Sequence, residues 1–127
     1  MNYLLDTHTA MWALSEKNKL SKIAKSIIDN TNIPLYISVV SAWEVAIKIS
    51  IGKSELQGGV ASFLEKMKEN GVEVLELKDY HISNVEKMPY LHRDPFDRML
   101  ISIALTEGLT ILTADVNIHK YDVSWCW

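Results

Sequence analysis

Short apolar runs alternate with stretches of helical periodicity along the chain. Apolar runs predict strands at residues 2–5, 35–38, 72–77, 109–113 and 123–127. Between them, helix-forming or helically spaced apolar residues predict helices at residues 7–15, 22–28, 41–51, 60–71, 79–88 and 95–107. Strands that alternate with helices are typical of a parallel sheet covered on both faces. The pattern therefore predicts an α/β fold, and we interpret residues 1–127 as one domain.

The helix predicted at residues 95–107 has a well-defined beginning. Asp94 suits the capping position, and Pro95 suits the first helical position. The positions three, four, seven and eight residues beyond Asp97 are all apolar: Leu100, Ile101, Ala104 and Leu105. The Asp97 carboxylate therefore shares the face that the helix turns towards the core. A carboxylate on such a face needs a partner.

Four acidic residues occupy related positions in the predicted fold. Asp6 ends the first strand, and Asp115 follows the fourth strand. Glu44 and Asp97 lie in the first turns of the predicted helices at 41–51 and 95–107. In right-handed β-helix-β units, strand carboxyl ends and helix amino ends meet at one edge of the sheet. We therefore expect the four carboxylates to converge there.

Each acid also has an ordinary structural interpretation. Glu44 follows Ser41 at capping-box spacing, Asp97 repeats that spacing after Asp94, and the other two acids suit strand-end turns. A helix cap contributes about 1 kcal/mol, whereas two carboxylates about 4 Å apart repel by roughly 4 kcal/mol at an effective dielectric near 20. Four converging carboxylates are therefore unfavourable without a cation. Mg²⁺ and Mn²⁺, which prefer oxygen ligands, are the natural counterparts.

Composition limits the classes of function that need to be considered. The 127 residues are 48% hydrophobic and 23% charged, with a formal net charge of −3 and a pI near 5.8. No basic field indicates nucleic-acid binding, although bound cations would offset the acids locally. A single cysteine, Cys126, excludes an internal disulfide and a multi-thiolate metal site. The absence of an export signal or long apolar run favours a soluble, cytoplasmic protein without membrane attachment.

Other polar and aromatic residues fit structural roles first. The four histidines, at positions 8, 81, 92 and 119, show no zinc-like spacing, so we favour surface or packing roles. Arg93 and Arg98 suit either phosphate contacts or salt bridges to the neighbouring acids. The lysines at 17, 19, 22 and 25 are interpreted mainly as a solvated face. For the tryptophans at 12, 43, 125 and 127, core packing is the first interpretation, and a homodimer or partner interface is the second.

Four stretches of the chain resemble those of PIN-domain proteins, and more narrowly VapC-like ribonuclease toxins of type II toxin–antitoxin systems. The stretches are LLDTH at 4–8, SVVSAWEVAIK at 38–48, HRDPFDRMLISIA at 92–104 and LTILTAD at 109–115. The resemblance implies a three-layer α/β/α sandwich with a five-stranded parallel sheet. It also implies an RNA endonuclease that depends on Mg²⁺ or Mn²⁺, with an antitoxin protein as partner.

The resemblance implies a role for particular residues. The family's acids correspond to Asp6, Glu44, Asp97 and Asp115, and its polar helper beside the last acid corresponds to Thr113. Asp6 and Asp97 are our first choices as direct metal ligands. Glu44 and Asp115 are left with three alternatives: direct ligation, holding metal-bound water, or proton transfer.

Three other kinds of protein were compared with this pattern. Receiver-type phosphoacceptor domains have paired acids after the first strand and a lysine after the fifth, which this chain lacks. Phosphatases of the haloacid-dehalogenase type have a two-aspartate signature, whereas here Asp6 is followed two residues later by His8. A catalytically silent PIN-like module that binds RNA or protein is the remaining alternative, and the intact set of acids disfavours it.

Overall fold

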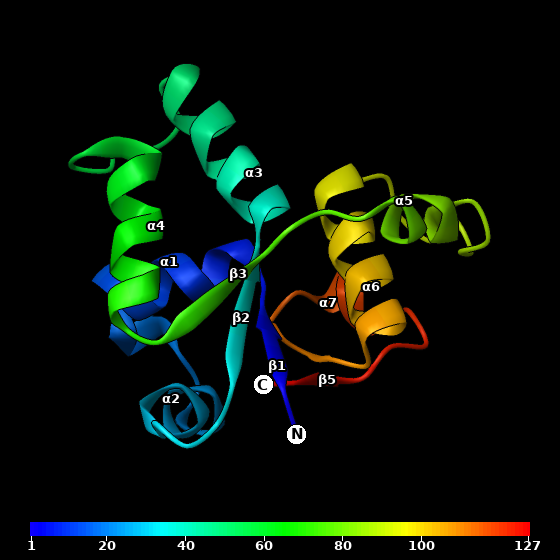
Figure 1. Ribbon diagram of the computed structural model, residues 1–127, viewed down its shortest axis with the longest axis horizontal. Helices are drawn as coiled ribbons and strands as arrows, with labels where there is room; N and C mark the ends of the chain where they lie inside the picture. Colours follow the sequence, from blue (N-terminus) through cyan, green and yellow to red (C-terminus); the bar gives the residue numbers. More distant parts are fainter.

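The computed structural model describes residues 1–127 and contains one sheet of five parallel strands. The strands are β1 (Tyr3–Leu5), β2 (Leu35–Ser38), β3 (Val72–Leu75), β4 (Thr110–Leu112) and β5 (Trp125–Cys126). Their order across the sheet is β3-β2-β1-β4-β5 (Figure 1). In the central strand, Tyr3 pairs with Leu35 of β2 and with Thr110 of β4. The predicted five-stranded parallel sheet is confirmed.

Helices on both faces of the sheet give three layers (Figure 1). One side carries α1 (Thr7–Ser15), α2 (Lys22–Asp29) and α4 (Gly59–Glu69), and the other carries α6 (Pro95–Glu107) and α7 (Val116–His119). Helix α3 (Val39–Ser50) contacts α1, α4 and α6, and α5 (Asp79–Val85) packs on α6. A short 3-10 helix, η1 (Lys17–Lys19), follows α1.

Alternating side chains of the strands divide the core into two halves. Leu5 and Leu112 pack with residues of α1, α2 and α4, such as Phe63. Their neighbours Leu4 and Ile111 pack with the apolar side chains of α6. Successive side chains of a strand point to opposite faces, so the central strands contribute to both halves. Each fully buried leucine contributes about 1.5–3 kcal/mol, which makes these strands a firm base for the loops at their ends.

Several helix and strand boundaries differ from those predicted. Helix α3 begins at Val39 rather than at residue 41, because the Ser38 hydroxyl accepts the Val40 amide at 3.0 Å and caps the helix. Helix α7 was not predicted, since four residues are too few to show an apolar period. Strands β3 and β5 are shorter than predicted, and both lie at the edges of the sheet.

Core packing, our first interpretation of the tryptophans, is wrong for Trp43 and Trp125, whereas Trp127 packs against the core. Trp43 is 62% exposed and Trp125 is 43% exposed. Trp12 and Trp127 are half-buried, with their ring centroids 5.9 Å apart. Aliphatic side chains and one phenylalanine already fill the space between the layers, which leaves these large rings at its margins.

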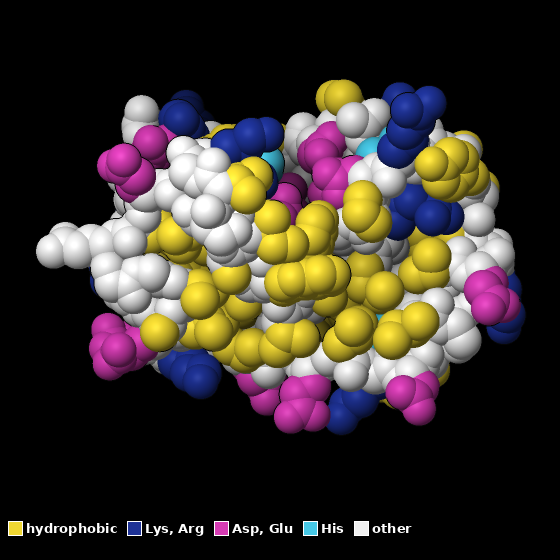
Figure 2. All heavy atoms as spheres, turned by 90° about the horizontal axis from the view of Figure 1, so that it is seen from above, with side chains coloured by type: hydrophobic (Ala, Val, Ile, Leu, Met, Phe, Trp, Pro, Cys, Tyr) yellow, Lys and Arg dark blue, Asp and Glu magenta, His cyan; other side chains and the backbone are white.

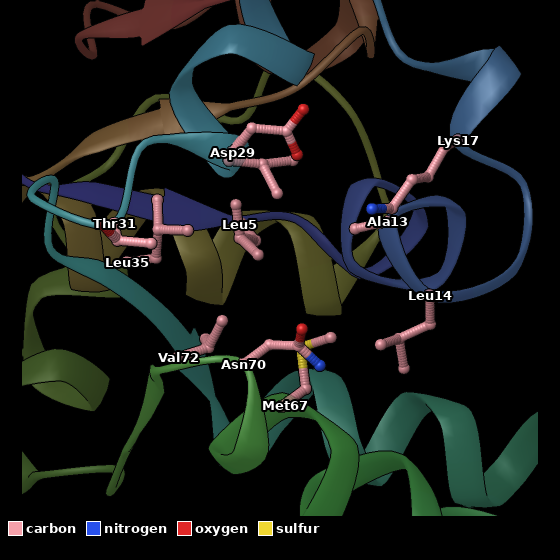
Figure 3. A pocket seen from close by; sticks show the side chains of 11 residues that line it. Leu5, Ala13, Leu14, Lys17, Asp29, Thr31, Leu35, Met67, Asn70 and Val72 are labelled. Atoms are coloured by element: carbon pink, nitrogen blue, oxygen red, sulfur yellow. The ribbon is translucent and has the colours of Figure 1, made fainter.

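A cavity of about 390 Å³ lies among α1, α2, α4 and the sheet (Figure 3). Leu14, Met67 and Val72 are among its apolar lining residues, and Lys17 and Asp29 also line it. None of the four candidate acids contributes to it, so it is separate from the site described below. No helix in the fold is both long enough and apolar enough to cross a membrane.

Candidate active site

Asp6 and Thr113 connect the carboxyl ends of the two central strands β1 and β4. Asp6 is 5% exposed and caps α1, because its Oδ1 accepts the Thr9 amide at 2.7 Å. The fully buried Thr113 hydroxyl donates a short hydrogen bond to Asp6 Oδ2. The same hydroxyl oxygen accepts the Asp115 amide at 3.0 Å. Thr113 therefore connects the first and the last of the four candidate acids, Asp6 and Asp115.

Glu44 reaches the same edge from α3, although not from its first turn. Because α3 begins at Val39, Glu44 lies in the second turn, and the predicted capping box with Ser41 does not form. Instead the Thr7 hydroxyl donates to Glu44 Oε1 at 2.7 Å and lies 3.0 Å from the Ser41 hydroxyl. Lys48, one turn further along α3, forms an ion pair with Glu44 Oε2 at 3.2 Å. The buried Glu44 carboxylate is thus held by a hydroxyl and an ammonium group.

Asp97 lies in the first turn of α6, as predicted. Asp94 caps this helix by accepting the amides of Phe96 and Asp97 at 2.9 and 3.0 Å. The Asp97 side chain does not complete a capping box and turns instead to His92, whose Nε2 lies 3.2 Å from Asp97 Oδ2. Burial, followed by the negative charges of Asp94 and of the other three candidate acids, raises the pKa of Asp97 to about 8.

Asp115 begins the helix that was not predicted. Its Oδ1 accepts the Asn117 amide at 2.8 Å and so caps α7. The residue is half-buried, and its other carboxylate oxygen makes no hydrogen bond or ion pair within the chain. Asp115 is therefore a helix cap rather than the strand-end turn former of its ordinary interpretation, and the cap uses only one of its two carboxylate oxygens.

The four acids line two neighbouring cavities at the carboxyl edge of the sheet. A cavity of about 290 Å³ is lined by Asp6 and Asp115, and a cavity of about 360 Å³ is lined by Glu44, Asp97 and Asp115. His8 contributes to both. Figure 2 views the molecule from this edge and shows acidic side chains gathered near the middle, partly recessed, beside a broad hydrophobic area. The structure thus brings the four acids together.

Positive charge compensates this group of acids only in part. Lys48 is the one lysine or arginine that forms an ion pair with any of the four. Arg98 lies over the Tyr90 ring at 5.0 Å, and neither Arg93 nor Arg98 forms the salt bridge to the acids that was one of our two interpretations. The protein therefore relieves only part of the repulsion among the acids, which adds to burial in raising the pKa of Asp97.

The donor set suits a hard divalent cation, because carboxylate oxygens are the ligands that Mg²⁺ and Mn²⁺ prefer. Asp97 and Asp115 each have one oxygen without a partner in the chain. Both oxygens of Asp6 accept hydrogen bonds, but each retains a further lone pair. No three His, Cys, Asp or Glu side chains already lie close enough to hold one ion. Mg²⁺ usually binds one or two carboxylates and keeps several waters, so three direct carboxylate ligands are not required.

A model of a known protein family matches nearly the whole chain. The family is described as the PIN domain, and the match covers residues 3–124. This chain belongs to the PIN-domain family. The aligned range includes every acid of the candidate site, as well as Thr113 and the strands β1 to β4, and it ends one residue before β5.

Individual relatives of this PIN domain agree in length and fold. It is 25% identical over 118 residues to Ribonuclease VapC22 of Mycobacterium tuberculosis, covering 93% of this chain and 90% of that protein. VapBC2 from Rickettsia felis bound to a promoter DNA fragment has a chain of similar structure, with a TM-score of 0.74, 16% identity, and 99% and 98% of the two chains covered. A toxin–antitoxin complex from Klebsiella pneumoniae gives a TM-score of 0.67, 12% identity, and coverage of 99% and 97%.

Sequence reasoning missed two residues that hold Asp97 in this PIN domain. The mostly buried His92 ring contacts Asp97 through Nε2, and its Nδ1 lies 2.9 Å from the Tyr121 hydroxyl. That hydroxyl accepts the Leu91 amide at 3.3 Å, which leaves its proton for His92 Nδ1. In the tautomer that carries its proton on Nε2, His92 donates to the ionised Asp97 carboxylate. His92 and Tyr121 are 29 positions apart in the sequence, and no local pattern reveals this contact.

Proposed function

We propose that this PIN domain is a divalent-metal-dependent endoribonuclease that hydrolyses phosphodiester bonds of RNA. The observation that carries the proposal is the convergence of four carboxylates from separate segments around Asp97, with little compensating positive charge. The similarity to Ribonuclease VapC22 supports RNA as the substrate. A cation at this place offsets the acids and provides a contact for the negatively charged phosphate, which the acids alone would repel.

The proposed cation ligands are Asp6 and Asp97, with Glu44 and Asp115 able to join them. Mg²⁺ or Mn²⁺ bound there supplies a Lewis acid that lowers the pKa of water and neutralises charge on the phosphate oxygens. The protein's part is to hold the carboxylates in place. Thr113 orients Asp6, and His92 orients Asp97. Glu44 and Asp115 are also our candidates for accepting a proton from the attacking water.

A toxin of a toxin–antitoxin pair is the proposed biological role. Chains of similar fold occur in VapBC2 of Rickettsia felis and in a toxin–antitoxin complex of Klebsiella pneumoniae. We infer that the partner of this chain is an antitoxin protein. We also infer that the chain acts in the cytoplasm, where RNA is accessible, and that it has an apolar surface available for a homodimer. The exposed Trp43 and Ile51 of the α3 region are suited to such a protein interface.

The experiment is a cleavage assay with purified protein and total RNA. Wild-type protein is incubated with Mg²⁺, with Mn²⁺ or with chelator, and Asp97→Asn is the matched variant, because it keeps the shape of the side chain and removes its charge. We expect cleavage by the wild type with metal only, and a reduction of at least about 100-fold in Asp97→Asn. Equal cleavage by both proteins, or cleavage that persists in chelator, contradicts the proposal.

The alternative function is a catalytically silent module that binds RNA or protein. The observation that favours it is that no three candidate ligands already lie within reach of one ion. This alternative predicts no metal-dependent cleavage by correctly folded wild-type protein, and RNA or protein binding that Asp97→Asn leaves unchanged. The same assay, supplemented by a binding measurement, therefore separates the two functions.

A further inference from the structure

Two aromatic side chains, His8 and Trp12, lie beside the acids, and we call this pair the aromatic wall. His8 and Trp12 lie one helical turn apart on α1, with their ring centroids 6.0 Å apart and their planes inclined by 39°. Both line the cavity of about 290 Å³, together with Asp6, Ala114 and Asp115. This volume is near the lower end of the roughly 300–1,000 Å³ that is usual for small-ligand sites. The cavity thus combines flat aromatic surfaces with two of the candidate metal ligands.

The Trp12 ring is held in place from its other sides. Trp127, at the opposite end of the chain, packs against it at 5.9 Å between ring centroids. The Lys19 ammonium group lies 5.9 Å from the centre of the Trp12 ring. Trp12 nevertheless remains half-buried rather than buried. A large aromatic ring that is fixed by its neighbours and still borders a cavity is organised in advance for stacking.

The aromatic wall and the acids form a continuous surface. His8 and Asp115 line both this cavity and the neighbouring one that contains Glu44 and Asp97. A group that rests against His8 and Trp12 is therefore adjacent to the place where the four carboxylates meet. Lys19 of η1 lies against the Trp12 ring but does not line the cavity, so its positive charge lies beside the aromatic wall rather than among the acids.

We propose that His8 and Trp12 form a stacking site for one unpaired base of single-stranded RNA, next to the phosphate that is cleaved. This inference rests on the proposed nuclease function and adds how the substrate is positioned. Unpaired bases expose flat faces that stack on aromatic side chains without requiring a particular sequence. Stacking also provides attraction that the acidic edge does not offer to a polyanion. Lys19, which is exposed and pairs with Glu16 at 2.5 Å, would exchange that partner for a backbone phosphate of the same strand.

The test measures the contribution of one base with short, single-stranded oligoribonucleotides. A series of oligoribonucleotides carries one abasic position at each place in turn, and binding is measured in Mg²⁺ on the Asp97→Asn protein, so that cleavage does not interfere. We expect one abasic position to weaken binding by about tenfold. Adding Trp12→Leu should weaken binding of the intact oligonucleotide by a similar factor and abolish the abasic effect, because both changes remove the same contact.

Control variants separate stacking from folding. Trp12→Phe retains an aromatic face and should retain most of the abasic effect, and His8→Ala changes an exposed residue and should reduce that effect. Trp43→Leu is the matched control, because it removes a more exposed tryptophan that does not line this cavity. An abasic effect that persists in Trp12→Leu, or an equal loss of binding in Trp43→Leu, overturns the stacking site.

Cleavage by the protein with an intact Asp97 is measured in parallel, so that the two proposals fail in different ways. If RNA is cleaved with metal but the abasic effect does not depend on Trp12, the stacking site is wrong and the nuclease function stands. If RNA is bound with a Trp12-dependent abasic effect but never cleaved, the stacking site stands and the nuclease function is wrong. If the protein neither binds nor cleaves RNA, both are wrong.

Discussion

At the scale of the residue, the Asp97 carboxylate lies on the core-facing side of its helix and also belongs to the candidate site. Its face of α6 is apolar, and its pKa is raised to about 8 from an ordinary value of 3.8, first by burial and then by the surrounding acids. His92 Nε2 lies 3.2 Å from one of its carboxylate oxygens. Asp97 is therefore the acid whose ionisation costs the folded protein most.

Asp97 should make the folded state less stable as the pH rises. Between about pH 4 and pH 8 the folded protein retains a proton that the unfolded chain has lost, so the free energy of unfolding falls with pH in this interval. Asp97→Asn removes this dependence and should stabilise the protein at pH 8 by on the order of 1–2 kcal/mol. Urea unfolding at pH 5 and pH 8, in chelator, measures the difference.

The control for this prediction is Asp122→Asn, which changes an exposed aspartate. We expect its pH dependence to match that of the wild type. Parallel stability profiles for wild type and Asp97→Asn would show that Asp97 titrates as an ordinary aspartate.

At the scale of the element, the site depends on what joins the ends of β1 and β4. The two strands pair through the backbone, and Thr113 adds a side-chain connection from one strand end to the acid of the other. The same hydroxyl accepts the amide of Asp115 just before α7. One buried hydroxyl thus sets the relative positions of a strand end, a helix cap and two acids.

Thr113→Val should destabilise the protein by about 1–3 kcal/mol, because it leaves a buried carboxylate oxygen and a buried amide without a partner while preserving the shape of the side chain. Thr113→Ser keeps the hydroxyl and should lose only about 0.8 kcal/mol for one methyl group. Denaturant unfolding measures both, and RNA cleavage should follow the same order. Equal losses in the two variants would mean that the methyl group, not the hydroxyl, matters at this position.

At the scale of the whole molecule, the parallel topology concentrates negative charge at one edge. Because β1 and β4 are central and α3 and α6 begin at the same edge, four segments distant in sequence present their acids to one place. The net charge of −3 gives no sign of this concentration of negative charge, because lysines elsewhere in the chain balance most of the acids. The charge distribution, more than the total charge, therefore determines what the molecule attracts.

A divalent cation should stabilise the folded molecule through these acids. At 100 times its dissociation constant, a cation bound only by the folded state adds about 2.7 kcal/mol to the free energy of unfolding. We expect Mg²⁺ to raise the melting temperature of the wild type, more at pH 8 than at pH 5, and to have a much smaller effect on Asp97→Asn. NaCl at matched ionic strength is the control. An equal Mg²⁺ effect on both proteins would place the ion elsewhere.

Local pattern was sufficient for much of the fold. The strand β2 and the helix α6 with its Asp94 cap were predicted closely, because periodicity and capping depend on residues only a few positions apart. The helix α7 was not predicted, because it is too short to show an apolar period. The start of α3 was not predicted closely, because two serines suit its cap. The choice between Ser38 and Ser41 depends on where β2 ends.

The sequence by itself determined which acids lie at strand and helix ends, and hence that they share an edge of the sheet. Only the tertiary structure decided their partners: Thr113 for Asp6, Thr7 and Lys48 for Glu44, and His92 for Asp97. It also decided that Trp43 and Trp125 lie at the surface, with Trp12 beside the acids. The reason is physical, because hydrogen bonds and burial depend on the distance between side chains in space, and packing sets that distance between segments with no local relation.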